Sequence, residues 1–169
     1  MPLFWKQGYA NTGLQDLEKA TGVNKSGLYS EFKDKEDLFL ASLRYYYETR
    51  CGRELLSAEP LGWDNIENFL KVVTQPCAGG QKGCFGVSSM RELGQLSKKA
   101  HDILTESRAN LKRQFTKNIA AAGPPVAPEL LSELVSTFFS GLCIEQNLNP
   151  SNASVIRKVK DFMSTIRSA

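Results

Sequence analysis

The sequence predicts an all-α protein in which a short helix-turn-helix segment is followed by a series of longer helices. Apolar residues recur at helical spacing in several windows, and no window alternates apolar and polar residues over the length of a strand. Glycine and proline separate these windows, for example at Gly22, Pro60, Pro76, Gly123 and Pro150. A chain of 169 residues is long enough for one or two small domains.

Composition narrows the class of protein. Hydrophobic residues make up 41% and charged residues 23%, and no apolar run reaches the roughly 20 residues that cross a bilayer. The segment before Gly8 is too short for a signal peptide, so we expect a cytoplasmic protein with no membrane partner. One histidine and four scattered cysteines form no metal-ligand motif, and no acid–base or nucleophile constellation stands out. We therefore expect no metal, no cofactor and no enzyme.

The cysteines are Cys51, Cys77, Cys84 and Cys143, which we expect to be free thiols in a reducing cytosol. Cys77 and Cys84 flank a glycine-rich segment, residues 78–83. This segment lacks the spacing of a phosphate-binding loop and is interpreted as a linker. The alternative is that Cys77 or Cys84 senses oxidants or electrophiles, which requires a reactive thiolate.

Two short helices joined by a tight turn are predicted near the start of the chain. Thr12 is expected to cap the first helix, with Gln15 at capping-box spacing, and Gly22 is expected to end it. Asn24 is a natural N-cap for the second helix, which extends to about Phe32. In DNA-binding proteins the second helix of such a pair enters the major groove. We assign to the core of this segment Leu17, Ala20, Val23, Leu28 and Phe32.

The second of these helices carries little apolar surface. Leu28 and Phe32 share one face, whereas the other positions hold short polar groups and one phenol. Such a face suits contact with a DNA groove. The local charge is unusual for this role, because residues 1–37 carry five basic and six acidic side chains, a net charge of −1.

Longer helices follow. Asp34 is expected to cap a helix that runs to about Leu56, and Asp64 or Asn65 to cap one that ends before Pro76. The remaining helices are expected over residues 85–96, 98–122, 128–147 and 153–166.

The motif resembles the tetracycline-repressor (TetR) family of bacterial regulators. The resemblance is carried, without a gap, by Gly8, Tyr9, Thr12, Leu17, Ala20, Gly22, Val23, Leu28, Tyr29, Phe32, Asp34, Lys35 and Leu38. It implies a DNA-binding domain over residues 1–40, in which the N-terminal arm and most of helix 1 of the family are missing. It also implies an effector-binding and dimerisation domain over residues 41–169.

The resemblance also implies roles for individual residues. Thr12 and Lys35 correspond to phosphate-contacting positions, although Thr12 could serve only as a cap and Lys35 only as a solvated charge. The full set expected to contact DNA is Thr12, Lys25, Ser26, Gly27, Tyr29, Ser30 and Lys35.

Two further sites are expected in the second domain. Aromatic and sulfur-containing residues are candidates for lining an effector pocket, although such residues at helical spacing are more often core: Trp63, Phe69, Phe85, Met90, His101 and Phe115. The last two helices each carry an apolar face, and two copies would form a four-helix bundle. The expected dimer interface is Leu130, Leu134, Phe138, Leu142, Val155, Val159 and Phe162.

The function expected from the sequence is that of a ligand-responsive, DNA-binding transcriptional regulator. The first hypothesis is a dimeric repressor that a small molecule releases from a palindromic operator. Its partners are then double-stranded DNA, a second copy of the chain and an unidentified small-molecule effector. The alternative is a truncated ligand- or thiol-sensing dimer that no longer binds DNA by itself.

Overall fold

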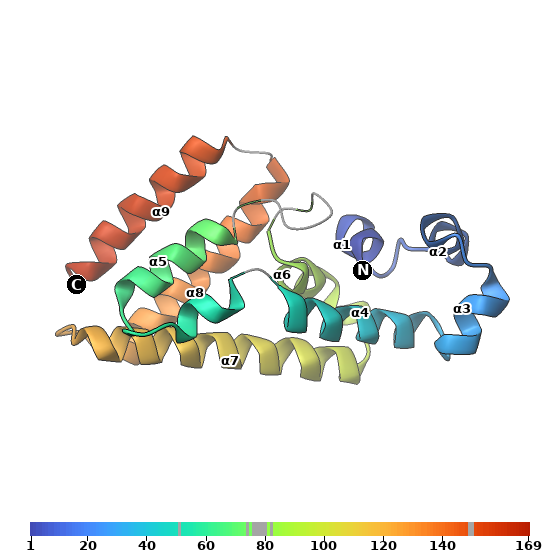
Figure 1. The fold of residues 1–169 in the computed structure, drawn as a ribbon, viewed down its shortest axis with the longest axis horizontal. Helices are drawn as coiled ribbons and strands as arrows, with labels where there is room; N and C mark the ends of the chain where they lie inside the picture. Colours follow the sequence, from blue (N-terminus) through green and yellow to red (C-terminus); the bar gives the residue numbers. More distant parts are fainter. Residues whose placement is uncertain (51, 74, 76–80, 82, 149–150) are drawn as a thin grey trace. The chain divides into compact units, whose positions relative to one another are not determined.

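The structure is a computed structural model that describes residues 1–50, 52–73, 75, 81, 83–148 and 151–169. Helices and loops make up this described part, and no strand is assigned within it, which confirms the predicted all-α class. The chain divides into two compact units (Figure 1). Unit 1 comprises Met1–Thr49 and Phe85–Glu106, and unit 2 comprises Arg50–Cys84 and Ser107–Ala169. No helix within the described residues is long and apolar enough to cross a membrane.

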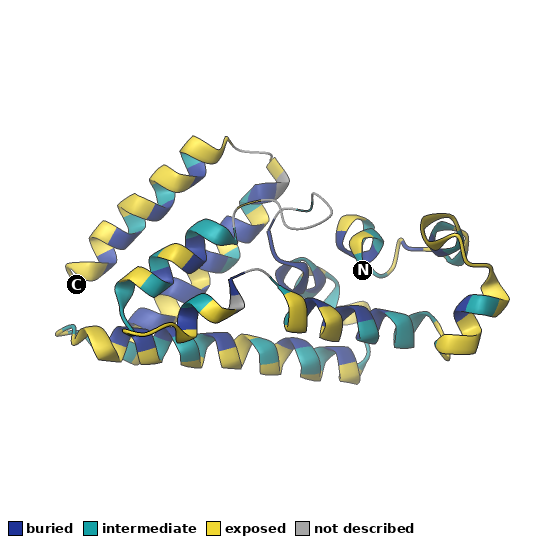
Figure 2. Cartoon of the chain, viewed as in Figure 1, coloured by how far each residue is buried: buried dark blue, intermediate teal, exposed yellow. Residues whose placement is uncertain are grey.

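Unit 1 contains the predicted helix-turn-helix and an aromatic core. Its elements are α1 (Pro2–Gln7), α2 (Leu14–Thr21), α3 (Lys25–Glu31), α4 (Lys35–Thr49), α6 (Phe85–Ser89), the 3-10 helix η2 (Met90–Gln95) and the first part of α7 (Lys98–Ala122). Edge-to-face ring pairs join α1 to α4: the centroids of Phe4 and Phe39, and of Trp5 and Tyr46, are 5.2 Å apart. Phe85 of α6 packs against the same buried cluster (Figure 2).

Helix α4 is shorter than the sequence predicts. It follows Asp34, whose carboxylate accepts the Asp37 N–H at 2.8 Å, as expected of an N-cap. It ends at Thr49, and the chain continues as the 3-10 helix η1 (Arg53–Ser57) after Gly52. Gly52 has a φ of 77°, a left-handed conformation that does not continue an α-helix.

The helix predicted over residues 85–96 is interrupted. α6 gives way to η2, and Glu92 inside η2 has φ −112° and ψ 18°, outside the helical region. Periodicity of apolar residues does not register a kink of this kind, because the spacing of side chains along the sequence is unchanged.

Unit 2 is a helical bundle. It contains η1, α5 (Trp63–Val72), the rest of α7, α8 (Pro128–Glu145), the short η3 (Gln146–Leu148) and α9 (Asn152–Arg167). Phe69 of α5 lies at the centre, with its ring centroid 5.6 Å from those of Phe115 and Phe139. Helices α7 and α9 occupy the predicted ranges to within a residue.

A buried amide fixes the loop before α5. Asn118 donates to the Leu56 carbonyl at 2.8 Å and accepts the Gly62 N–H at 3.0 Å. Asn65 donates to the same Asn118 oxygen at 3.0 Å. The prediction that Asp64 or Asn65 caps α5 is wrong, because Gly62 is the N-cap and Asn65 instead ties the preceding loop to α7.

Candidate nucleic-acid interface

The turn between α2 and α3 is held by side chains on both sides. Gly22 closes α2 in the left-handed conformation, with φ 70°, as predicted. Asn24 caps α3 as predicted, because its side-chain oxygen accepts the Gly27 N–H at 2.9 Å. Glu18 of α2 accepts the Lys25 N–H at 2.5 Å, a contact across seven residues that no local sequence pattern predicts. The first turn of α3 is therefore fixed to α2.

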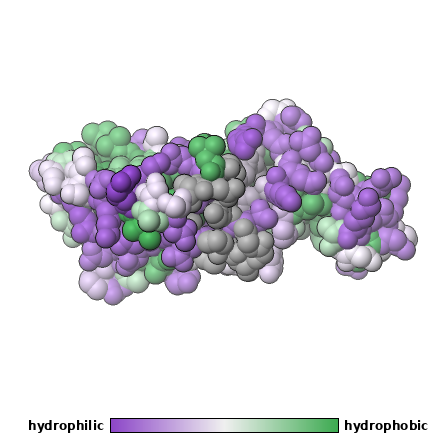
Figure 3. All heavy atoms as spheres, turned by 90° about the horizontal axis from the view of Figure 1, so that it is seen from above, coloured by the Kyte–Doolittle hydropathy of each residue, from purple (hydrophilic) through white to green (hydrophobic). Residues whose placement is uncertain are grey.

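Helix α3 presents polar side chains to solvent. Lys25, Ser26, Tyr29 and Ser30 are exposed, and Figure 3 shows mainly hydrophilic residues on the surface of α2 and α3. The Tyr29 side chain is 39% exposed, with the Lys25 ammonium 6.0 Å from its ring centroid. These four residues form a contiguous face with hydrogen-bond donors, acceptors and one positive charge.

Packing within the protein explains why residue 27 is a glycine. A Cβ at this position would come 2.7 Å from the Val23 side chain. Gly27 is among the residues expected to contact DNA. In the structure its missing Cβ allows α3 to pack against the turn, and Gly27 itself is half-buried.

Thr12 occupies a different position from the one predicted. Gly13 is the N-cap of α2, and its N–H donates to the Asp16 carboxylate at 3.0 Å, so the prediction of a Thr12 cap is wrong. Thr12 is completely buried, and its hydroxyl donates to the Gly8 carbonyl at 2.6 Å. In this structure the hydroxyl is used to close the loop after α1 and does not face solvent.

Lys35 is also engaged within the protein. Its ammonium donates to the carbonyls of Tyr9 and Thr12, each at 3.1 Å, and lies 4.5 Å from the Tyr9 ring centroid. An ammonium has three donors, so one remains for a phosphate.

Burial raises the pKa of the Tyr9 phenol, and the negative charges of Glu36 and Asp34 raise it further.

The predicted core of the helix-turn-helix is only partly buried. Leu17 and Leu28 are buried and Phe32 is intermediate, whereas Ala20 is exposed and Val23 is 41% exposed. Within the described residues no element covers that side of the turn, so the assignment of the last two to the core is corrected. The space between α2, α3 and α4 is a cavity of only about 10 Å³, too small for an effector.

The six candidate effector-pocket residues divide between the two units. Phe69 and Phe115 are fully buried and pack ring to ring in unit 2, where Trp63 is half-buried at the start of α5. Unit 1 holds the other three. Phe85 is in the aromatic core, Met90 is half-buried in η2, and His101 is half-buried on α7.

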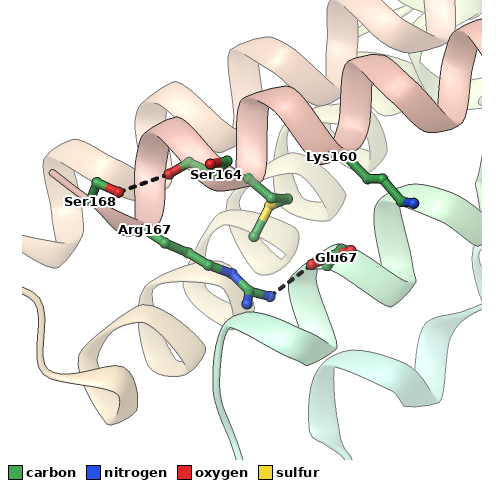
Figure 4. A pocket seen from close by; sticks show the side chains of 6 residues that line it. Glu67, Lys160, Ser164, Arg167 and Ser168 are labelled. Atoms are coloured by element: carbon green, nitrogen blue, oxygen red, sulfur yellow. Dashed lines mark hydrogen bonds and ion pairs between the residues drawn. The ribbon is translucent and has the colours of Figure 1, made fainter.

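A hollow in unit 2 has the size of a small-molecule site. It has a volume of about 380 Å³, lies between α5 and α9, and is lined by Glu67, Lys160, Met163, Ser164, Arg167 and Ser168 (Figure 4). Its charged groups are largely paired, because Arg167 contacts Asp64 at 2.7 Å and Glu67 at 2.8 Å. None of the six predicted pocket residues lines it.

The seven residues predicted for the dimer interface do not share one exposed face. Leu142, Val155 and Val159 are buried inside unit 2, at 3%, 3% and 0% exposure, so their apolar surface is already covered within the protomer. Leu130 and Leu134 are 57% and 50% exposed. Phe138 of α8 and Phe162 of α9 are half-buried and stack with their centroids 3.8 Å apart. We call Leu130, Leu134, Phe138 and Phe162 the α8–α9 apolar face.

Two of the four cysteines can be placed. Cys84 and Cys143 are buried, and a hydrogen bond with Cys84, together with burial, raises the pKa of the Cys143 thiol well above its usual range. Cys51 and Cys77, and most of the glycine-rich segment 78–83, lie outside the described residues. A buried, protonated thiol is chemically inert compared with the thiolate that sensing requires.

The arrangement of α2 and α3 defines a helix-turn-helix protein, and comparison with known proteins gives the family. Residues 1–42 match the family model described as bacterial regulatory proteins, tetR family. The chain is 50% identical over 48 residues to the HTH-type transcriptional repressor ComR of Escherichia coli K12, a match that covers 28% of this chain and 23% of that protein. Over residues 1–42, which contain the helix-turn-helix, the chain therefore matches the tetR family.

A second curated regulator is similar to the same part of the chain. The chain is 49% identical over 37 residues to the transcriptional regulator AcrR of Shigella flexneri, covering 22% of this chain and 17% of that protein. The matches thus span about a quarter or less of the length of these curated relatives.

Solved structures extend the likeness of fold over nearly the whole chain. A cysteine mutant of the TetR family transcriptional regulator CifR, complexed with 26-bp double-strand operator DNA, has a TM-score of 0.81 at 21% identity. That match covers 96% of this chain and 90% of the CifR chain. The reduced form of Escherichia coli NemR has a TM-score of 0.78 at 16% identity, covering 98% and 89%. The fold of both units is thus that of TetR-family regulators.

Proposed function

We propose that this chain is a DNA-binding transcriptional regulator that acts as a dimeric repressor and is released from a palindromic operator by a small molecule. The observation that carries the proposal is the exposed polar face of α3, whose first turn Asn24 and Glu18 hold in place. A short helix gains little stability from such a face, whereas a recognition helix needs it. The regulators with the same fold and N-terminal domain support this reading.

Individual roles follow from chemistry and exposure. Lys25 and Tyr29, which are exposed, would contact phosphate and base edges, and the exposed Ser26 and Ser30 hydroxyls would hydrogen-bond in the groove. Lys35 contributes its remaining donor to a phosphate while holding the loop after α1. Because residues 1–37 carry a net charge of −1, non-specific affinity for DNA is expected to be low.

The proposed dimer uses the α8–α9 apolar face. Leu130 and Leu134, which are half or more exposed, are costly to leave in water, and pairing two copies about a two-fold axis buries them. Gly141, on the same outward side of α8, has open space around its missing Cβ, which allows a second helix to approach closely. Residues 41–169 would then hold the effector and the dimer contacts, and residues 1–40 the DNA-binding face.

The effector acts through differential affinity for two states of the dimer. A ligand that binds better to a state with unsuitable spacing of the two α3 helices weakens DNA binding by that difference in affinity. Of the candidate sensing residues in unit 1, Phe85 lies in α6, which packs against α1 and α4, and Met90 directly follows α6 as the first residue of η2.

The direct test is selection of duplexes from a random library by the full chain, followed by binding measurements on the selected sequence. We expect a palindromic sequence, bound with an affinity that falls steeply as salt rises. Enrichment of no sequence at low salt, by a folded dimer, would overturn the proposal. A thermal-shift screen of small molecules, repeated with the duplex present, then identifies effectors that stabilise the protein and displace DNA.

A further inference from the structure

A carboxylate from a distant part of the sequence holds the loop that leads into the helix-turn-helix. Glu92 of η2 accepts the Tyr9 N–H at 2.6 Å through Oε2 and the Ala10 N–H at 3.4 Å through Oε1. Gly8 makes the approach possible, because a Cβ there would lie 2.5 Å from Glu92 Oε1. Gly8 also has a φ of 86°, which other residues rarely adopt.

The same loop is held from its other side by a cation. Lys35, the first residue of α4, donates to the carbonyls of Tyr9 and Thr12. The N–H groups of this loop therefore donate to an anion, and its carbonyls accept from a cation. Such charge-assisted hydrogen bonds are stronger than those between neutral groups. Gly13, the N-cap of α2, follows immediately, so the position of this loop sets where α2 begins.

Glu92 lies at the kink of η2, in a turn that α7 also fixes. The next residue, Leu93, has its carbonyl oxygen 2.6 Å from His101 Nε2. A carbonyl only accepts, so this ring nitrogen carries the proton. Two candidate effector contacts thus flank Glu92 in the sequence: Met90 lies two residues before it and His101 nine residues after it.

We propose that Glu92 is a positioning residue, which holds the loop Tyr9–Thr12 so that α2 and α3 are oriented for DNA and which releases that loop when the turn around Leu93 moves. The proposal rests on the proposed function, since it assigns a route by which the sensing segment acts on the DNA-binding helices. A ligand that displaces His101 from the Leu93 carbonyl would move the turn and withdraw the carboxylate.

The test compares four single variants of the full chain on the duplex that the wild-type chain selects. Glu92→Ala removes the acceptor, Glu92→Asp keeps the charge but shortens its reach, and Glu92→Gln keeps one oxygen acceptor. Glu106→Gln, at an exposed position of α7, removes an equal charge without touching the loop. Binding is measured on the selected duplex and on a scrambled one, and amide hydrogen exchange is measured at Tyr9 without DNA.

We expect Glu92→Ala and Glu92→Asp to lower affinity for the selected duplex about tenfold or more and to speed exchange at Tyr9, because the charge-assisted bonds are lost. Glu92→Gln should recover part of both losses, and Glu106→Gln should change neither. Affinity for the scrambled duplex should not fall in any variant. This comparison distinguishes a loss of helix positioning, which affects only the selected duplex, from a change in net charge, which affects both duplexes.

Wild-type affinity for the selected duplex in Glu92→Ala and Glu92→Asp would overturn the proposal and leave the proposed function intact. Glu92→Gln, which is nearly isosteric, decides the matter if the other two do not fold: unchanged affinity and unchanged exchange at Tyr9 would likewise overturn it. Failure of the wild-type chain to select any duplex would instead overturn the proposed function, and this proposal with it.

Discussion

Lys35 shows how one side chain can serve the fold and a ligand together. Its ammonium satisfies two loop carbonyls and covers the Tyr9 ring, while a third donor remains. A substitution here therefore changes stability as well as DNA binding, unlike a substitution at an exposed phosphate contact.

We expect Lys35→Ala to lower the free energy of unfolding by about 1–2 kcal/mol, because two carbonyls lose a charged donor. Lys33→Ala, at an exposed position two residues earlier, is the matched control and should leave stability unchanged. Urea denaturation of both variants measures the difference. Equal stability of the two variants would show that the Lys35 contacts contribute nothing to the fold.

Cys143 provides a pH-dependent prediction at the same scale. Its pKa is raised in the folded protein by the hydrogen bond with Cys84 and by burial, so folding favours the protonated thiol. That contribution is complete below the thiol pKa of the unfolded chain, about 8.5, and is lost as pH rises above it. Under reducing conditions, wild-type stability should fall more between about pH 8 and pH 10 than that of Cys143→Ala. Parallel pH profiles of the two proteins would contradict this.

Single residues also show what a sequence can and cannot reveal. The Asn24 cap and the left-handed Gly22 were predictable because their causes lie within three residues along the chain. Glu92 was not, because it contacts Tyr9 across 83 positions and no local pattern marks it. Thr12 was misplaced by one residue, since Gly13 with Asp16 competes successfully for the same cap.

At the scale of elements, the loop before α5 depends on one buried amide. Asn118 of α7 is fully buried and joins Leu56, Gly62 and Asn65 through its two polar atoms. The periodicity of α7 predicted the helix over its whole length, but a buried polar position on its apolar side was not foreseen. Fixing this loop positions α5 and hence Phe69 in the core of unit 2.

Removing the Asn118 amide should destabilise the loop before α5. We expect Asn118→Ala to destabilise the protein by about 2–4 kcal/mol, because it leaves buried groups without partners. Asn110→Ala, at an exposed position of the same helix, should cost nothing measurable. Thermal unfolding followed by circular dichroism compares the two, and a wild-type midpoint for Asn118→Ala would rule out the anchoring role.

The helices themselves were largely predictable, and their interruptions were not. α7, α8 and α9 follow from apolar spacing and from the glycines and prolines between them. The end of α4 before Gly52 and the kink at Glu92 depend on backbone conformations that the spacing of apolar residues does not encode. The candidate DNA-binding face was predictable because it lies on one short helix, whereas no effector site could be read from residues that divide between two units.

At the scale of the whole molecule, the exposed apolar surface of unit 2 predicts self-association. Leu134→Lys places a charge in the α8–α9 apolar face and should convert a dimer to a monomer. Ile156→Lys is the matched control: Ile156 is 39% exposed and lies about 120° around α9 from Phe162. Light scattering coupled to gel filtration gives the masses. A dimer that survives Leu134→Lys, or that only Ile156→Lys disrupts, would place the interface elsewhere.

The measurement that tests the central claim most directly is the affinity of the full chain for its selected duplex, with and without substitutions on α3. We predict that Lys25→Ala and Tyr29→Ala each weaken binding about tenfold, equivalent to about 1.4 kcal/mol. Lys117→Ala, which removes an exposed charge from α7, should stay within about twofold of wild type, since it leaves every α3 contact in place. Unchanged binding by both α3 variants, or equal weakening by Lys117→Ala, would contradict the assignment of α3 as the DNA-binding helix.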